Sequence, residues 1–551
     1  MEKVTFKLNG ADTSCAAGES LISLTGDRGS DSPLPVVAAL VNNAVKELSY
    51  IPTGGEEIQL LTSADKTGND VYLRGLMHVL VQAVNNVLPE RKLSIEHSMN
   101  EGIYCEIRGD EEFSPFDLER VEREMRKICE RDEPFIRRLI SREEAIAFYN
   151  AEGNTDKARL LSHREDAVFK VYSCGGVSEY FFGYMPPSTG YVRRFDLVMS
   201  HPGFVLLYPR QKDPEGKLVF TQSPKLAHVF RQSERWAEIL NVGTVPDLND
   251  LVESGNLPDF IRVNEALHER TIAEIATRVV REKRRIVLVA GPSSSGKTTF
   301  TQRLSVQLRA AERKTAIISL DNYYRDRSTL TPRPDGTIDL EDINAIDAPL
   351  FNKHLCEMLN GKEVQIPRFD FKSKKILNGK LIKLLPDQIL LVEGIHGLND
   401  AICESVDPED KFKIYISALT QLNLDSHDRI STSSVRLIRR LVRDCLHRGM
   451  PAERTLSMWN SVREGEERWI FPYQEQCDIM FNSTLVYELL FLKKRAVPLL
   501  KEVPKDSPNF IEANYLAKLL KYFVDPNPED ETEIPRTSIL REFIGGGSFE
   551  Q

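Results

Sequence analysis

Long apolar runs are missing from this sequence. No uninterrupted apolar stretch approaches the roughly 20 residues that a helix needs to span a bilayer. The N-terminal segment, MEKVTFKLNG, has no apolar core of the kind found in signal peptides. The eight cysteines form no Cys-x-x-Cys pair and have no close histidine at zinc-finger spacing. We therefore expect a cytoplasmic protein that does not contact membranes and whose cysteines are reduced.

An excess of positive charge is also absent. The chain contains 72 Lys and Arg residues against 82 Asp and Glu residues, which gives a formal net charge of −10. The molecule as a whole therefore does not attract nucleic acid, and any contact with RNA has to be local. Charged residues make up 28% and hydrophobic residues 41% of the sequence, as in ordinary globular proteins. At 551 residues, the chain is long enough for about three or four domains.

The sequence changes character several times along its length. Short alternating segments joined by glycine turns, such as VTFKLNG and EEIQLLT, predict a small mixed unit at the start. Apolar residues at helical spacing follow, and then a β-rich stretch ends in FVLLYPR. Further on, apolar strands alternate with helical stretches, which is typical of a parallel α/β sheet. The predicted units are 1–65, 66–215, a helical connecting segment 216–280, an α/β unit 281–524 and an exposed C-terminal tail 525–551.

A phosphate-binding loop is predicted at the start of the α/β unit. Residues 291–298, GPSSSGKT, fit the pattern GxxxxGK[ST] between a buried strand and a helix. Glycines let the backbone wrap around phosphate oxygens, and amides at a helix start point toward an anion. Lys297 can neutralise the β- and γ-phosphates, and the Thr298 hydroxyl can bind Mg²⁺. The predicted nucleotide-binding residues of this loop are Gly291, Pro292, Ser293, Ser294, Ser295, Gly296, Lys297, Thr298 and Thr299.

A carboxylate follows the next predicted strand. The segment AIISLDNYYRD, residues 316–326, delivers Asp321 after apolar residues, about one helix and one strand beyond Lys297. Asp321 should therefore end the neighbouring strand, at the edge where open α/β sheets bind ligands. There it can accept the proton of an attacking hydroxyl group. The alternatives are an aspartate that caps a turn and an aspartate that only binds metal.

Two further groups of charged residues are candidates for the same site. Glu393 ends the apolar strand QILLVEG, where a carboxylate can reach Mg²⁺ directly or through water. The segment RLIRRLVRD places four arginines on one helical face, namely Arg436, Arg439, Arg440 and Arg443. They would repel one another without an anion among them, so we expect a lid that closes over the triphosphate. A solvated basic face that contacts RNA is the alternative.

Five motifs follow one another in order between residues 285 and 500. They are GPSSSGKTT, SLDNYY, VQIPRFDF, ILLVEGIHGL and RRLVRDCLHRG, and together they resemble the uridine kinase and phosphoribulokinase group of P-loop kinases. This resemblance implies an α/β P-loop kinase domain with a parallel sheet, which uses ATP or GTP with Mg²⁺. It implies that Asp321 and Lys297 are catalytic and that Thr298 and Glu393 hold the metal. The lid arginines that it implies are Arg440, Arg443 and Arg448, and the acceptor-site residues are Asp321, Tyr324, Asp339, Phe369 and Phe371.

The front of the chain resembles two modules of another family. Residues 1–65 look like a TGS domain, which is a small β-grasp fold, and the residues from about 70 to 215 are similar to the second N-terminal domain of threonyl-tRNA synthetase. That α+β domain holds a metal with HxxxH and CxxxH motifs. Here the first motif reads RGLMH, which leaves only His78, and the later segment GYMPPSTGY contains neither Cys nor His. A single histidine cannot hold zinc, so we expect a retained fold, lost editing chemistry, and contacts with RNA or protein.

The favoured hypothesis is a nucleoside kinase that transfers the γ-phosphoryl group of ATP or GTP to a nucleoside 5′-OH. Lys374 stands where uridine-cytidine kinases carry a base-contacting histidine, so a kinase of another small hydroxyl metabolite is one alternative. The other alternative is a binding protein associated with RNA or the ribosome, in which the P-loop acts as a switch. A homo-oligomer is compatible with the sequence.

Overall fold

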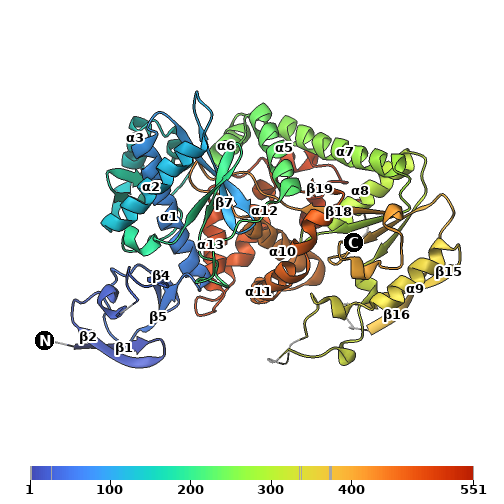
Figure 1. Cartoon of the computed structure of the whole chain (residues 1–551), viewed down its shortest axis with the longest axis horizontal. Coiled ribbons are helices and arrows are strands. Elements are labelled where there is room, and N and C mark those ends of the chain that lie inside the picture. The colour runs from blue at the N-terminus through green and yellow to red at the C-terminus, as the bar shows by residue number, and fades with distance from the viewer. Residues whose placement is uncertain (1–2, 27, 334–335, 337, 371–374, 550–551) are drawn as a thin grey trace.

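The chain folds into three units that follow one another in sequence (Figure 1). The structure is a computed structural model that describes residues 3–26, 28–333, 336, 338–370 and 375–549. The predicted α/β fold, preceded by two smaller units, is confirmed. Within the described residues, no helix is both long enough and apolar enough to cross a membrane.

The first unit is a five-stranded mixed sheet of the β-grasp type. Its strands are β1 (Lys3–Leu8), β2 (Ala11–Ala16), β3 (Val36–Val41), β4 (Ala44–Lys46) and β5 (Glu57–Thr62). They lie in the order β2-β1-β5-β3-β4, with β1 parallel to β5 and the other pairs antiparallel. Phe6 and Ile58 are buried while their neighbours Thr5 and Glu57 are exposed, as the alternation of side chains along a strand requires.

The second unit is an α+β fold built around helix α1 (Lys66–Val87), which is apolar on most sides and largely buried. Its other elements are β6 (Lys92–Met99), β7 (Gly102–Arg108), α2 (Pro115–Arg131), β8 (Ile136–Ser141), α3 (Arg142–Ala151), α4 (Thr155–Ser162), β9 (Val168–Cys174), β10 (Val177–Glu179), β11 (Asp196–Ser200) and β12 (Gly203–Leu207). The strands form two sheets, with orders β11-β12-β7-β6 and β10-β9-β8. Helix α2 begins after Ser114, because Ser114 and Asp117 form a capping box.

Three helices lead from the second unit to the third. They are α5 (Pro224–Leu240), α6 (Val245–Glu253) and α7 (Leu257–Arg281). Although this stretch is polar overall, Ile261 and Ile272 are fully buried, and they belong to the same hydrophobic core as Phe300 of the following unit. The helices of this connecting stretch therefore pack as an outer layer of the third unit.

The third unit is a parallel α/β sheet. Its strands and helices are β13 (Ile286–Ala290), α8 (Lys297–Ala310), β14 (Thr315–Ser319), α9 (Ala348–Leu359), β15 (Glu363–Asp370), β16 (Lys375–Lys383), β17 (Ile389–Glu393), β18 (Lys411–Ser417), α10 (Thr432–Arg448), α11 (Ala452–Trp469), β19 (Ile479–Asn482), α12 (Glu488–Lys501), α13 (Phe510–Leu520) and α14 (Arg541–Ile544). The sheet has the order β14-β17-β13-β18-β19 with every pair parallel, and β15 and β16 form a separate hairpin at the far end of the molecule (Figure 1).

Both faces of the parallel sheet are covered. Val287 and Val289 of β13 enter one hydrophobic core, whereas Ile286 and Leu288 enter another. Successive side chains of a strand point to opposite faces, so a strand with two covered faces has to be apolar throughout. This explains the continuous apolar run IVLVA and leaves the ends of the strands as the places where polar side chains gather.

A buried ionic cluster joins the second and third units. Lys157 of α4 is fully buried and forms an ion pair with Glu179, and its Nζ lies 3.8 Å from Oδ2 of Asp425. His427 Nδ1 lies 3.0 Å from Oε1 of Glu179. Burial lowers the pKa of Lys157, but Asp425 and Glu179 raise it more, so the lysine stays charged. Because Asp425 and His427 lie in the loop between β18 and α10, this loop is anchored in the second unit.

The C-terminal tail is not exposed along its length. The start of the tail, DPNPEDETEIP, is expected to be exposed, and this prediction is wrong for Ile534; most of residues 538–544, which follow, are buried as well. Ile534, Ile539 and Phe543 are at most 1% exposed and belong to the core of the third unit. The acidic run PEDETE precedes these apolar residues, so the average polarity of the segment hides them.

Substitution of Lys157 by alanine should destabilise the protein. It leaves the buried Glu179 and Asp425 without their cation, and loss of one partner of a buried ion pair costs about 3 to 5 kcal/mol. For a unit of 150 to 250 residues this corresponds to a fall of roughly 6 to 20 °C in the thermal midpoint, measured by differential scanning fluorimetry. Lys127→Ala is the control, because Lys127 is 58% exposed and pairs only at the surface. Equal midpoints for the two variants would contradict the role given to the cluster.

Candidate active site

The loop between β13 and α8 has the shape of a phosphate cradle. Gly291 lies very close to β18, the neighbour of β13 in the sheet. A Cβ at this position would meet the backbone oxygen of Ile416 at 1.9 Å, so only glycine fits. Gly296 has a φ of +83° and is the residue from which α8 begins. The first turn of α8 therefore presents amide groups that have no partner within the helix at the edge of the sheet where β13 ends.

Polar side chains of the loop are positioned to bind an anion. The Lys297 Nζ donates to the backbone oxygens of Gly291 and Pro292, each at 3.0 Å, which folds the lysine back over the loop. Burial lowers the pKa of Lys297, and Glu393 and Asp321 oppose this shift. The hydroxyls of Ser294 and Ser295 are buried and have no hydrogen-bond partner among the described residues. These unpaired donors fit a nucleotide phosphate.

Two carboxylates end neighbouring strands beside the loop. Asp321 follows β14, and Glu393 ends β17, where it is in register with Ser319 of β14 and Val289 of β13. Burial and the nearby Asp321 raise the pKa of Glu393 to about 7. Burial also raises the pKa of Asp321, while Lys297 and two lid arginines lower it. A half-buried pair of carboxylates at the edge of the sheet where the loop begins is a set of oxygen donors that fits Mg²⁺.

The acidic segment that precedes α9 places Asp339 and Glu341 in different surroundings. Asp339 pairs with Arg333 at 2.5 Å, lies 3.9 Å from Arg468 and accepts a hydrogen bond from the Glu341 amide. Glu341 instead faces the site: burial raises its pKa to about 7, Arg440 lowers it, and Asp321 and Lys297 lie within electrostatic reach. The sequence analysis missed Glu341, because TIDLED offers three acids and no periodicity to choose among them.

The arginines of α10 divide into two groups. The expectation that all four face the triphosphate is wrong for Arg436 and Arg439, which are buried in ion pairs with Glu466 and Glu488. These acids come from other helices, so the arginine pattern of α10 could not reveal them. Arg439 also donates to the backbone oxygen of Ser483, which ties α10 to the end of β19.

The remaining arginines border the cradle. Arg440 donates to the Ser293 hydroxyl at 2.8 Å. Arg443 and Arg448 both contact Asp444 and both lie within electrostatic reach of Asp321. The structure therefore brings these three arginines to the same edge of the sheet as the loop and the carboxylates.

Of the predicted aromatic residues, two are described. The rings of Tyr324 and Phe369 are buried, with 5.5 Å between their centroids. Burial and the nearby Asp321 raise the pKa of Tyr324 well above its usual value, so its hydroxyl stays protonated. Phe371 and Lys374 lie outside the described residues.

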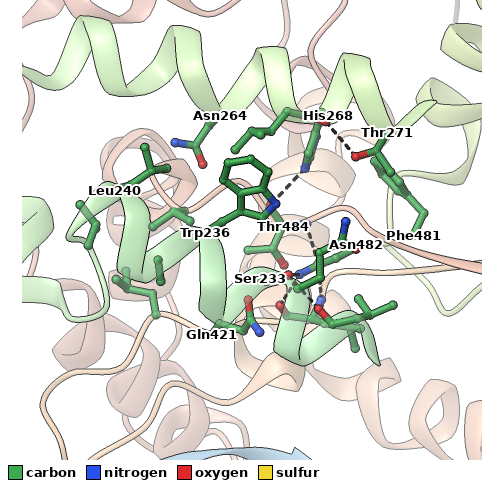
Figure 2. A pocket seen from close by; sticks show the side chains of 18 of the residues that line it. Ser233, Trp236, Leu240, Asn264, His268, Thr271, Gln421, Phe481, Asn482 and Thr484 are labelled. Atoms are coloured by element: carbon green, nitrogen blue, oxygen red, sulfur yellow. Dashed lines mark hydrogen bonds between the residues drawn. The ribbon is translucent and has the colours of Figure 1, made fainter. Parts of the chain in front are cut away.

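A separate cavity of about 110 Å³ lies between α5, α7 and the ends of β18 and β19 (Figure 2). His268 Nε2 lies 3.2 Å from the backbone oxygen of Thr484, and burial lowers the pKa of this histidine to about 3. Trp236 from α5 lines the same cavity. None of the residues around it belongs to the phosphate-binding loop, so the cavity is distinct from the candidate active site.

In the second unit, His78 is fully buried and packs against Phe135, with 5.2 Å between the ring centroids. Burial lowers the pKa of His78 to about 4. This environment suits a neutral packing residue of α1.

The sheet order and the loop between β13 and α8 define a P-loop nucleotide-binding domain. Residues 286–488 match the family described as the Phosphoribulokinase / Uridine kinase family. The resemblance predicted from the order of motifs is therefore confirmed for this region.

The front of the chain is similar to threonine–tRNA ligases. The ligase of Desulforamulus reducens is 31% identical over 261 residues, which are 46% of this chain and 41% of the relative. The ligase of Carboxydothermus hydrogenoformans is 34% identical over 163 residues, which are 29% and 26% of the two chains. The chain thus spans less than half the length of these relatives.

Solved structures of P-loop kinases are similar to part of the chain. A protein described as a possible uridine kinase from Bacillus stearothermophilus has a TM-score of 0.28 at 15% identity, over 39% of this chain and 98% of that one. A D-glycerate 3-kinase from Cryptococcus neoformans has a TM-score of 0.22 at 14% identity, over 46% and 88% of the two chains.

Substitution of Glu341 by glutamine should stabilise the nucleotide-free protein at high pH. Between the usual value of 4.5 and about 7, folded Glu341 holds a proton that the unfolded chain has released, so stability falls as pH rises through this window. The shift corresponds to at most about 3 kcal/mol. The difference in thermal midpoint between Glu341→Gln and the parental protein should therefore grow from pH 5 to pH 8. The exposed Glu453→Gln is the control, and a difference that is independent of pH would refute the assignment.

Proposed function

We propose that the third unit is a kinase that transfers the γ-phosphoryl group of ATP or GTP to a small hydroxyl compound, with a nucleoside 5′-OH as the acceptor. The observation that carries this proposal is the convergence of Lys297, which follows β13, and Asp321, which follows β14, at one edge of the sheet. The sequence predicted that these two strands are adjacent, which is wrong, because β17 lies between them. A P-loop that only binds or hydrolyses nucleotide has no need of a buried acceptor side with its own carboxylates and aromatic rings. The match to the Phosphoribulokinase / Uridine kinase family supports this assignment.

The donor side consists of the loop and its lysine. The backbone amides at the end of the loop and in the first turn of α8 hold the phosphates, and Lys297 balances the charge of the β- and γ-phosphates. Thr298 and Glu393 are the residues that would hold Mg²⁺, which supplies charge neutralisation between the phosphates when bound. Glu393, whose pKa is raised to about 7 by burial and by Asp321, would lose its proton more readily once a cation is near.

The acceptor side consists of Asp321 and the residues around it. Burial raises the pKa of Asp321, which makes its carboxylate a stronger base for the proton of the attacking hydroxyl. We assign Glu341, in preference to Asp339, to the hydroxyl groups of the acceptor, because Asp339 is held by Arg333 and Arg468. Tyr324 and Phe369 form the apolar wall on which a nucleobase can rest.

The arginines of α10 act on the transferred group. Arg440, Arg443 and Arg448 approach the same carboxylates from the lid side, and they would stabilise the charge that spreads over the phosphoryl oxygens in the transition state.

A second function is favoured by the similarity of the front units to threonine–tRNA ligases. In that case the front units contact RNA and the P-loop responds to the contact. The two functions are distinguished by the compound that stimulates ADP formation, which is a nucleoside for the kinase and RNA for the binding protein.

Substitutions of Lys297 and Asp321 should separate binding from chemistry. Lys297→Ala removes the cation of the donor side and should lower turnover at least about 100-fold. Asp321→Asn should bind MgADP with an affinity within about threefold of the parental value and lower kcat by about 100-fold or more, as loss of a general base does. Turnover is measured as ADP formation with a panel of nucleosides and sugar phosphates.

The control for Asp321→Asn is Asp326→Asn. Asp326 is exposed on the same segment, and its carboxylate accepts only local hydrogen bonds from Ser328. Parental rates for both variants would show that Asp321 is not the base.

A further inference from the structure

The C-terminal segment 534–545 lies directly on the phosphate-binding loop. A Cβ at Gly296 would meet Cγ2 of Ile539 at 2.5 Å, so the segment touches the residue from which α8 begins. Phe543 packs against Arg439 of α10, with 4.9 Å between the guanidinium carbon and the ring centroid. The segment therefore contacts both the loop and the lid helix that border the proposed donor site.

Glu542 carries a carboxylate into the cradle. Its Oε2 accepts a hydrogen bond from the Thr299 hydroxyl at 2.8 Å and one from the Thr299 amide at 3.3 Å. This amide belongs to the first turn of α8, where amides have no partner within the helix and where the helix dipole favours negative charge. Such donors are the ones that a P-loop offers to nucleotide phosphates. Glu542 thus binds where an anionic oxygen of the nucleotide would bind.

The carboxylate also supplies negative charge to the cations of the site. Lys297 and Arg448 both lie within electrostatic reach of Glu542. His447 of α10 contacts the backbone oxygen of Glu542 at 3.2 Å, which fixes the position of the segment against the lid. In the protein without nucleotide, Glu542 therefore partly replaces the triphosphate as the counter-charge.

We propose that the C-terminal segment occupies the nucleotide site of the free protein, with Glu542 in place of a phosphate oxygen, and that the nucleotide has to displace it. The proposal rests on the proposed function, because it regulates the same donor site. The amide and hydroxyl of Thr299 cannot serve a carboxylate and a phosphate at once, and the two anions would repel each other at this distance. The apparent affinity for nucleotide is then the intrinsic affinity multiplied by the fraction of molecules in which the segment has left the cradle.

The test is equilibrium binding of MgADP to the full chain by isothermal titration calorimetry. Glu542→Gln keeps the shape of the side chain and removes its charge, so its hold on Thr299 weakens. Loss of this charged hydrogen bond weakens the docking of the segment on the cradle, so MgADP binding should tighten about 10-fold. Glu533→Gln is the matched control, because Glu533 lies in the same tail and pairs with Arg262 away from the cradle. The control should bind MgADP with parental affinity.

A second measurement follows the segment itself. Hydrogen exchange of the amides of residues 534–545 in the parental protein should become faster when MgADP saturates the site, because displacement exposes them. The proposal would be overturned if Glu542→Gln bound MgADP no more tightly than the parental protein. It would also be overturned if MgADP left the hydrogen exchange of residues 534–545 unchanged or made it slower. Neither readout needs an acceptor. Tighter MgADP binding by Glu542→Gln without phosphorylation of any acceptor would support this inference while refuting the kinase assignment.

Discussion

The crowding of like charges at one edge of the parallel sheet is the constraint on which the rest of the structure depends. Asp321 and Glu393 end adjacent strands, Glu341 faces them, and burial raises the pKa of all three. Carboxylates removed from water are stable only when cations or protons balance them. Lys297 provides one cation from the loop, and α10 provides others. The strand order brings the carboxylates to this edge, α10 brings arginines, and the docked tail brings the carboxylate of Glu542.

The sequence predicted the parts of the site that depend on local pattern. The loop at 291–298 and the acids that end β14 and β17 follow from strand, loop and helix spacing, because parallel strands end at one edge. The distinction between Asp339 and Glu341 depends on which of the two side chains Arg333 neutralises, and the spacing of the acids in the sequence does not show this. In the same way, Arg436 and Arg439 are neutralised by acids of remote helices. The buried tail was missed because its apolar residues follow an acidic run.

The second unit shows how a synthetase-like fold can be used as a scaffold. His78 is enclosed by aromatic rings, and its lowered pKa keeps it neutral. The segment that follows β10 contacts the third unit, because the Phe182 amide donates a hydrogen bond to the Asp428 carboxylate at 2.8 Å. A loop of the α/β unit thus packs against the second unit through a hydrogen bond of its own.

The ionic cluster around Lys157 makes the two halves of the chain depend on each other. It holds the loop that leads into α10, so the helix that carries the lid arginines is supported from the front half of the protein. Separation of the two halves would leave Lys157 paired with Glu179 on one fragment and would take Asp425 and His427 away on the other. The loop before α10 would then lose its anchor, so an isolated kinase-like half would need a new support for this helix.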